Sequence, residues 1–220
     1  MVGKEKNINL PYTTWVYGFK FFGKYNVKIG LLSLRLKANG GTFLRFFNLR
    51  MMVEIALMIG LAVVLGMIKI YQAPWGGSIS LEMLPLIIVA YRHGLGPGLI
   101  AGLLYGMLNL ALDGLRFIVH PIQLLLDYPV AFALVGLAGL FPGRYWLGTT
   151  AGSLARLASH LVSGAIFFGY YAPEGQNVWL YSLIYNSSYI LPELVISGFL
   201  LWLVAKKTRH LGLLERQSLS

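Results

Sequence analysis

Long apolar runs joined by short polar connections fill the sequence from residue 52 to residue 205 and constrain its fold more than any other feature. Hydrophobic residues make up 57% of the 220-residue chain and charged residues only 12%, whereas soluble domains carry about 25% charged residues. So little charge cannot cover a water-facing surface, which excludes an ordinary soluble enzyme, a disordered chain and a coiled coil. We therefore expect an all-α integral membrane bundle of six helices, at roughly 52–71, 81–92, 95–112, 120–141, 146–171 and 178–205.

Basic residues gather at the two ends of the chain and divide it into three parts. Residues 1–50 hold nine Lys or Arg against one acid, Glu5, and interleave them with aromatic residues. We expect a basic aromatic extension at 1–50, a membrane domain at 51–205 and a basic cytoplasmic tail at 206–220. The extension either lies on an anionic membrane surface or precedes a functional start at Met51 or Met52. The body is nearly neutral, which argues against a nucleic-acid partner.

The basic residues in the connections predict the orientation of the helices. If the chain enters the membrane from the cytoplasm, the outer face receives only Lys69 and Arg116. This asymmetry satisfies the positive-inside rule, so both termini are expected in the cytoplasm. The outer connections then lie near 72–80, 113–120 and 172–177. The basic residues of the inner connections and the tail are Arg92, Arg144, Lys206, Lys207, Arg209 and Arg216.

Three polar residues fall at a similar depth in the outer half of the expected membrane segments. At about 1.5 Å per residue, Asp127, His160 and Asn186 lie within about 10 Å of one another in depth. Ionisable groups at such depth are costly and mark functional sites. A carboxylate among aromatic rings and an amide suits a small, flat, cationic ligand. The alternative is that the aromatic residues form an interfacial belt and that Asn186 and His160 bond neighbouring helices.

The other ionisable residues of the body have structural interpretations. Arg156 and Glu193 lie at matching depths in the fifth and sixth segments, which predicts that they form a buried ion pair. The remaining groups are expected to be solvated at segment ends or in cytoplasmic connections. They are Glu54, Glu82, His93 and His210.

Catalytic and metal-binding motifs are not found in the sequence. It has no Walker A loop, no His-Glu-x-x-His helix and no Gly-x-Ser-x-Gly elbow. With no Cys and four scattered His, we expect no metal site, no cofactor and no enzymatic activity of the chain itself. The first apolar segment instead carries small residues at helical spacing, which let two helices approach closely in lipid. They are Ala56, Gly60, Ala62 and Gly66.

Four blocks of the body carry most of these polar and aromatic residues: 76–80 (GGSIS) leading to Pro85, 120–128 (HPIQLLLDY), 160–169 (HLVSGAIFFG) and 179–186 (WLYSLIYN). Together with their spacing they resemble the thiamine-specific substrate-binding subunits (S-components) of energy-coupling-factor vitamin transporters. The resemblance covers about residues 51–205 and leaves out residues 1–50. It implies a six-helix protein in the bacterial cytoplasmic membrane that captures thiamine from outside. It also implies a transmembrane coupling subunit and two cytoplasmic ATPases as partners.

The resemblance implies a substrate-binding role for seven residues. Four of them are an acid, the Tyr that follows it, a histidine and an aromatic residue that stacks on the ligand. The other three are a Tyr and an Asn in the last membrane segment and a Trp in an outer loop that acts as a lid. In this order they are Asp127, Tyr128, His160, Phe168, Tyr181, Asn186 and Trp75. Some family members have Trp where this chain has Phe168, which changes the stacking geometry. A docking surface for the coupling subunit is implied on the first helix, at Ala56, Gly60 and Ala62.

Three other functions remain open from the sequence. An S-component for a different vitamin, such as riboflavin, would share the architecture and differ in its ligand. An integral-membrane enzyme would use Asp127 and His160 as acid and base, although no second carboxylate lies near Asp127 in the sequence. A purely structural membrane scaffold would bind no small molecule. A titration with thiamine distinguishes these possibilities.

Overall fold

The computed structural model describes residues 15–16, 19–20, 48–112 and 118–208. The chain divides into two units, Met1–Arg45 and Phe46–Ser220. In the first unit, the described residues form a short antiparallel pair, β1 (Trp15–Val16) with β2 (Phe19–Lys20). Residues 48–50 of the predicted extension are described with the second unit. The remaining residues of the extension and most of the predicted tail lie outside the described residues, as do Arg116 and His210.

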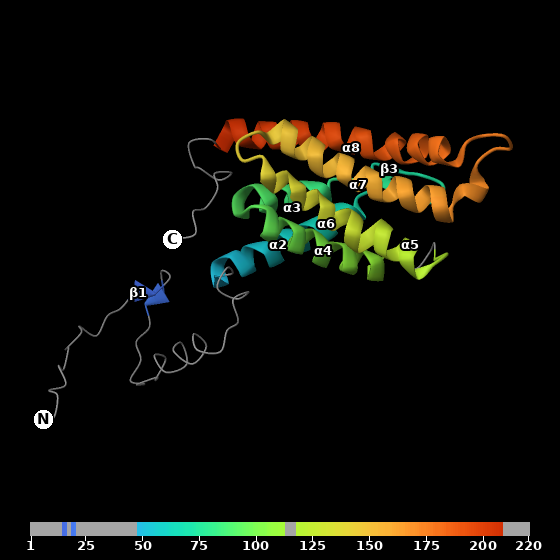
Figure 1. Ribbon diagram of the computed structural model, residues 1–220. Helices are drawn as coiled ribbons and strands as arrows, with labels where there is room; N and C mark the ends of the chain where they lie inside the picture. Colours follow the sequence, from blue (N-terminus) through green and yellow to red (C-terminus); the bar gives the residue numbers. More distant parts are fainter. Residues whose placement is uncertain (1–14, 17–18, 21–47, 113–117, 209–220) are drawn as a thin grey trace, which may run out of the picture. The chain divides into compact units, whose positions relative to one another are not determined.

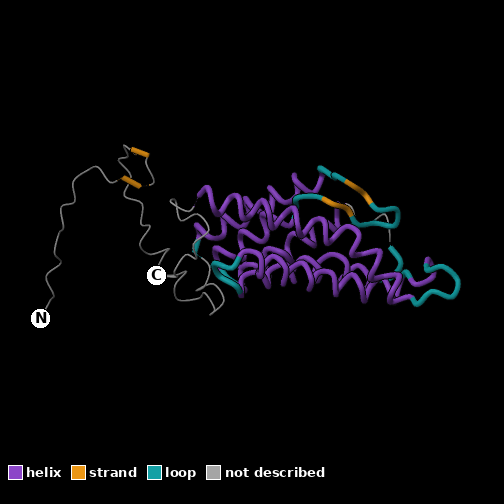
Figure 2. Tube along the Cα trace, turned by 90° about the horizontal axis from the view of Figure 1, so that it is seen from above, coloured by secondary structure: helices purple, strands orange, loops and turns teal. Residues whose placement is uncertain are grey.

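The second unit is built almost entirely from helices that run side by side along one direction (Figures 1 and 2). The prediction of a mostly helical protein is confirmed. Its described helices of more than ten residues are α2 (Leu49–Met67), α3 (Met83–His93), α4 (Leu95–Leu112), α7 (Tyr145–Phe167) and α8 (Val178–Thr208). Between α4 and α7 the chain forms α5 (Pro121–Leu125), the π-helix η3 (Leu126–Val130), α6 (Ala131–Val135) and the 3-10 helix η4 (Gly136–Leu140). A short 3-10 turn, η5 (Gly169–Tyr171), follows α7.

Four helical stretches of the described chain are long and apolar enough to cross a membrane. They are Leu49–Met67, Leu95–Leu112, Pro121–Leu140 and Val178–Lys207. This is fewer than the six crossing helices predicted from the sequence. The helix α3 has only 11 residues, about 16 Å, which is short of a bilayer's hydrocarbon core. The helix α7 is long enough, but it carries polar residues along its buried face, among them Thr149, Ser153 and Arg156.

Local signals explain where several helices begin and turn. The Asn48 side chain accepts a hydrogen bond of 2.8 Å from the Met51 backbone N–H, so α2 begins at Leu49, three residues before the predicted segment. Between α3 and α4, Gly94 has φ of +89°, which a residue without a side chain adopts at little cost. The helices α3 and α4 are therefore joined by Gly94 alone and pack against each other as a tight hairpin.

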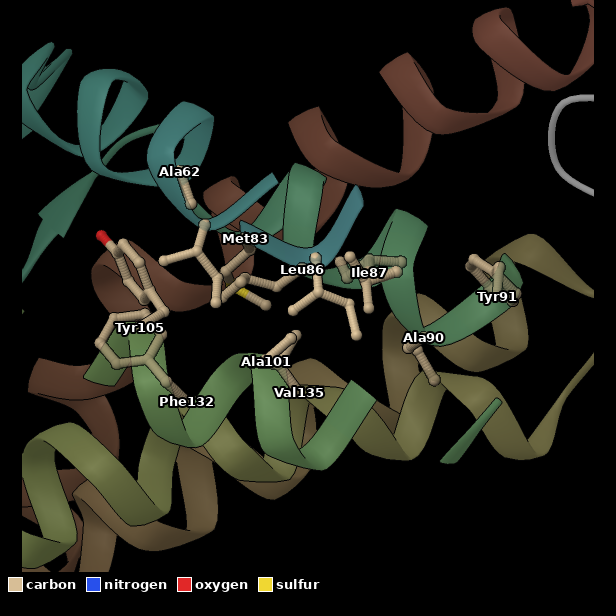
Figure 3. Close-up of a cluster of buried hydrophobic side chains, with 14 of the residues drawn as sticks. Ala62, Met83, Leu86, Ile87, Ala90, Tyr91, Ala101, Tyr105, Phe132 and Val135 are labelled. Atoms are coloured by element: carbon tan, nitrogen blue, oxygen red, sulfur yellow. The ribbon is translucent and has the colours of Figure 1, made fainter. Parts of the chain in front are cut away.

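The core lies between α2, α3, α4 and α6 (Figure 3). Tyr105 and Phe132 pack edge to face, with ring centroids 4.7 Å apart. Glycines bring two backbones into direct contact on one side of this core. A Cβ atom added to Gly102 of α4 would lie 2.0 Å from the Phe132 carbonyl oxygen, and one added to Gly136 would lie 2.3 Å from the Leu99 nitrogen. Such close approach is the packing that small residues allow in membrane helices.

The histidine at the end of α3 is buried, against expectation. His93 is only 7% exposed, and its Nε2 lies 3.3 Å from Glu54 of α2, which also pairs with Arg92. The prediction that His93 is solvated is wrong. Its position on the last turn of α3 turns the ring toward α2, because α2 and α3 pack against each other.

Candidate ligand-binding cavity

A cavity of about 450 Å³ opens where α2 ends and α8 begins. Its walls come from α2, α4, α7, α8, the 121–132 stretch and the β-hairpin of residues 71–79 that follows α2. The seven residues predicted to bind substrate all line this one cavity. They are Trp75, Asp127, Tyr128, His160, Phe168, Tyr181 and Asn186. The structure thus brings together residues that span more than a hundred positions, while their role in binding stays a prediction.

The Asp127 carboxylate is held between two neighbours at the cavity wall. Gln123 Nε2 donates a hydrogen bond of 2.8 Å to Asp127 Oδ2, and His160 Nδ1 lies 3.2 Å from Asp127 Oδ1. Asp127 lies in the π-helix η3, which also contains Pro129. A proline cannot donate a backbone hydrogen bond, which favours such a local widening of the helix. The arrangement leaves a partly exposed negative charge facing the cavity, which attracts a cation.

The amide of Asn186 is fixed at the crossing of α7 and α8. Its Nδ2 donates a 2.8 Å hydrogen bond to the Ser182 carbonyl and lies 3.4 Å from the His160 carbonyl oxygen. The Tyr189 hydroxyl donates to Asn186 Oδ1. The two helices cross closely because Gly164 has no side chain. A Cβ atom at this position would lie 2.3 Å from Ser182 Oγ. Asp127, His160 and Asn186 therefore lie close together, as the sequence predicted. Asn186 also bonds the neighbouring helix, which was the alternative explanation for this residue.

Aromatic rings line a large part of the cavity. Trp75 stacks on Tyr171 with ring centroids 4.3 Å apart, and Phe168 lies parallel to Tyr171 at 6.4 Å. Tyr181 and Tyr185 form another stacked pair at 6.2 Å. The flat ring faces and the Asp127 carboxylate together favour a planar, positively charged ligand.

The floor of the cavity holds a buried cluster of charges that the sequence only partly revealed. Arg156 Nη1 lies 2.9 Å from Glu193 Oε2, which confirms the predicted pair. Arg156 Nη2 also lies 3.3 Å from Glu82 Oε1, and the Tyr105 hydroxyl donates a hydrogen bond of 2.7 Å to Glu82 Oε2. Glu82 is 5% exposed, so the prediction that it is solvated is wrong. Glu82 lies at the buried start of α3, where Arg156 replaces the water that the carboxylate would otherwise need.

Several cavity residues were missed by the sequence reasoning. Gln123 lies four residues before Asp127, a helical spacing that could have suggested the contact. Tyr105 and Glu82 carry no such local signal, because their partners lie far away in the chain. Among the described residues, no group of three His, Asp or Glu side chains is arranged to hold a metal ion.

The predicted coupling surface is only partly accessible. Ala56 and Gly60 are exposed on α2 and line a shallow apolar groove with Ile59 and α4 residues. A Cβ atom added to Gly60 would meet no atom within 4 Å. Ala62 is fully buried and packs into the core shown in Figure 3. The prediction that Ala62 belongs to the surface is wrong, because it lies on the opposite side of α2 from Gly60.

A helical body with membrane-crossing stretches around an aromatic cavity with a fixed carboxylate defines a multi-pass membrane protein that binds a small ligand. A sequence model of the thiamine transporter protein family (Thia_YuaJ) matches residues 52–212. The chain belongs to this family, which places it among transporters rather than enzymes.

Individual relatives agree with this assignment. The chain is 40% identical to the thiamine transporter ThiT of Bacillus subtilis over 171 residues, 70% of this chain and 88% of the relative. It is 35% identical to ThiT of Lacticaseibacillus paracasei over 138 residues, 54% of this chain and 69% of the relative. A solved structure of ThiT from Listeria monocytogenes is similar with a TM-score of 0.67 and 28% identity, covering 76% of this chain and 98% of that one.

Proposed function

We propose that this protein is the thiamine-binding subunit of an energy-coupling-factor transporter and captures thiamine from outside the cell. The observation that carries the proposal is the convergence of seven predicted binding residues on one cavity with the Asp127 carboxylate in its wall. Thiamine has a permanently charged thiazolium ring and a flat aminopyrimidine ring, which match this charge and these aromatic faces. A volume of about 450 Å³ lies within the range of small-ligand sites.

The seven residues divide the ligand among them in this proposal. Asp127 supplies the negative charge and a hydrogen bond to the aminopyrimidine, and His160 and Phe168 stack on the rings. Tyr181 and Asn186 bond pyrimidine nitrogens. The remaining two residues, Tyr128 and Trp75, contact the hydroxyethyl arm and close the mouth from the hairpin. The cavity wall supports these roles, since all seven side chains contribute to it.

The proposed membrane arrangement has six helices with both termini in the cytoplasm. The inner basic residues and the position of the cavity support it, because the cavity lies at the end away from the start of α2 and the end of α8. The chain carries no nucleotide-binding motif, so energy must arrive through contact with a coupling subunit and two cytoplasmic ATPases. Ala56 and Gly60 are exposed at the groove of α2 and α4, where such a contact has room.

Calorimetric titration of the purified protein with thiamine tests the proposal. We expect saturable binding of thiamine and much weaker binding of riboflavin and pyridoxine in parallel titrations. Mass spectrometry of the recovered ligand should find thiamine unchanged. Stronger binding of another vitamin, or no binding of any, contradicts the thiamine assignment. A chemically altered ligand would favour an enzyme that uses Asp127 and His160.

A further inference from the structure

Three tyrosines follow one another at helical spacing along a single face of α8. Tyr181, Tyr185 and Tyr189 are four residues apart, which places them one turn after another. Their ring centroids lie 6.2 Å and 6.1 Å apart in sequence order. Only Tyr181 was predicted to bind the ligand, so the two others need a separate explanation.

The lid, which is the β-hairpin of residues 71–79, lies against two of these tyrosines, Tyr185 and Tyr189. Its strands β3 (Tyr71–Gln72) and β4 (Ser78–Ile79) pair antiparallel, and residues 73–77 form its tip. Within the tip, the Ala73 N–H donates to the Gly77 carbonyl at 2.9 Å. The tip lines the cavity through Trp75, Gly76 and Gly77.

Tyr185 joins the tip of the lid to α8 through both hydrogen-bonding functions of its hydroxyl. The oxygen accepts from the Trp75 backbone N–H at 2.8 Å, and the hydroxyl donates to the Gly76 carbonyl, also at 2.8 Å. A Tyr hydroxyl can donate one hydrogen bond and accept others, so its donor is fully used here. Both partners are backbone groups, and the contact is therefore independent of the side chains that the lid carries.

The ring of Tyr189 supports the lid in the same closed position, because the lid backbone packs against it. A Cβ atom on Gly77 would lie 2.5 Å from its ring, so the lid backbone rests directly on it. Gly77 has φ of +84°, which suits a residue without a side chain. Ala73 of the tip is 3% exposed and packs with Tyr189 and Tyr185. The lid is thus held by a flat aromatic support and by two directed hydrogen bonds from one side chain.

We propose that Tyr185 is a latch: a positioning residue that holds the lid closed over the cavity and sets how fast a bound ligand leaves. The inference rests on the proposed function, because it takes the cavity as the ligand site. Tyr185 acts on the ligand through the lid, since its hydroxyl is committed to Trp75 and Gly76. It also stacks on Tyr181, and Asn186 follows it directly, so the latch adjoins two residues proposed to touch the ligand.

The variant Tyr185→Phe tests the latch, because it removes the hydroxyl and keeps the ring. Stopped-flow measurements with thiamine should find dissociation about 10- to 100-fold faster, as expected for two lost hydrogen bonds. The association rate should change by no more than about threefold, since mutations within one interface act mostly on dissociation. Hydrogen–deuterium exchange should become faster in residues 71–79 and stay unchanged in α3 and α4.

Tyr145→Phe is the matched control, because Tyr145 lies at the other end of the bundle and contacts Tyr91 instead of the lid. It should leave both rates and the exchange of residues 71–79 unchanged. An unchanged dissociation rate in Tyr185→Phe overturns the latch, and so does faster exchange throughout α3 and α4, which would show general destabilisation. If the wild-type protein binds no thiamine, the proposed function fails, while exchange in the lid still tests the latch.

Discussion

The proposed binding of a cation depends on the charge of Asp127. Asp127→Asn keeps the shape of the side chain and removes its charge. We expect thiamine binding to weaken by about 1.5–3 kcal/mol, the range for hydrogen bonds to charged groups. Isothermal calorimetry on the purified variant measures the change in dissociation constant. Glu174→Gln, an exposed acid in the connection before α8, removes the same charge outside the cavity and should have little effect.

The aromatic contacts of the ligand can be tested by removing one ring at a time. Phe168→Ala and His160→Ala should each weaken thiamine binding by about 1 kcal/mol or more, the range for aromatic and cation–π contacts. Phe168→Trp provides the matching variant with a larger face and should bind at least as tightly as the wild type. Fluorescence titration measures all three. Wild-type affinity in both alanine variants would mean that the ligand stacks elsewhere.

Individual residues differed in how far the sequence could place them. Asp127, His160 and Asn186 were found by counting depth, because each is costly in lipid and therefore stands out. Glu82 was misplaced because burial depends on where the chain turns after α2, and its partner Arg156 is 74 residues away. The exposed and buried sides of α2 were also not separated by small-residue spacing alone, which is why Ala62 was wrongly grouped with Gly60.

Arg156 of α7 joins α3 and α8, because its buried guanidinium pairs with Glu82 at the start of α3 and with Glu193 of α8. Arg156→Ala leaves the Glu82 and Glu193 carboxylates buried without their cation, which typically costs about 3–5 kcal/mol of unfolding free energy. We expect a markedly lower unfolding temperature in detergent, measured by differential scanning fluorimetry. Arg144→Ala removes an exposed arginine at the start of α7 and should unfold at the wild-type temperature. Equal unfolding temperatures for the two variants would contradict this role of Arg156.

Helices were predicted well as a class and less well in detail. Apolar length identified the long helices, since it follows directly from composition. Boundaries moved by a few residues where a single side chain decides, as with the cap at Asn48. The π-helix around Asp127 and the pairing of the lid strands depend on contacts across the fold, which periodicity does not contain.

The proposed coupling to other subunits can be separated from ligand binding by adding bulk on α2. Ala56→Trp and Gly60→Trp should abolish thiamine uptake by cells and leave binding to the detergent-solubilised protein intact. The physical reason is that both positions are exposed and a Cβ atom on Gly60 would meet no described atom within 4 Å. Radiolabelled uptake and calorimetry on the same variants provide the two measurements.

Two further substitutions on α2 serve as controls for this experiment. Ala62→Trp should reduce both binding and uptake, because it overfills the core at a cost of about 1–3 kcal/mol. Leu57→Trp replaces a residue that is 68% exposed and should affect neither measurement. Equal loss of binding and uptake in Gly60→Trp would place the docking face on another helix.

The direct backbone contact at Gly102 and Gly136 has a mechanical consequence for the cavity. Two helices that touch through their main chains have no layer of side chains between them that could shift or repack. The wall formed by α4 and residues 131–140 is therefore stiff. Any change in the size of the cavity must be taken up on the other side, by the lid, the last turns of α7 and the first turns of α8. One wall of the cavity is therefore fixed, and the opposite wall is the part that can adjust to a ligand.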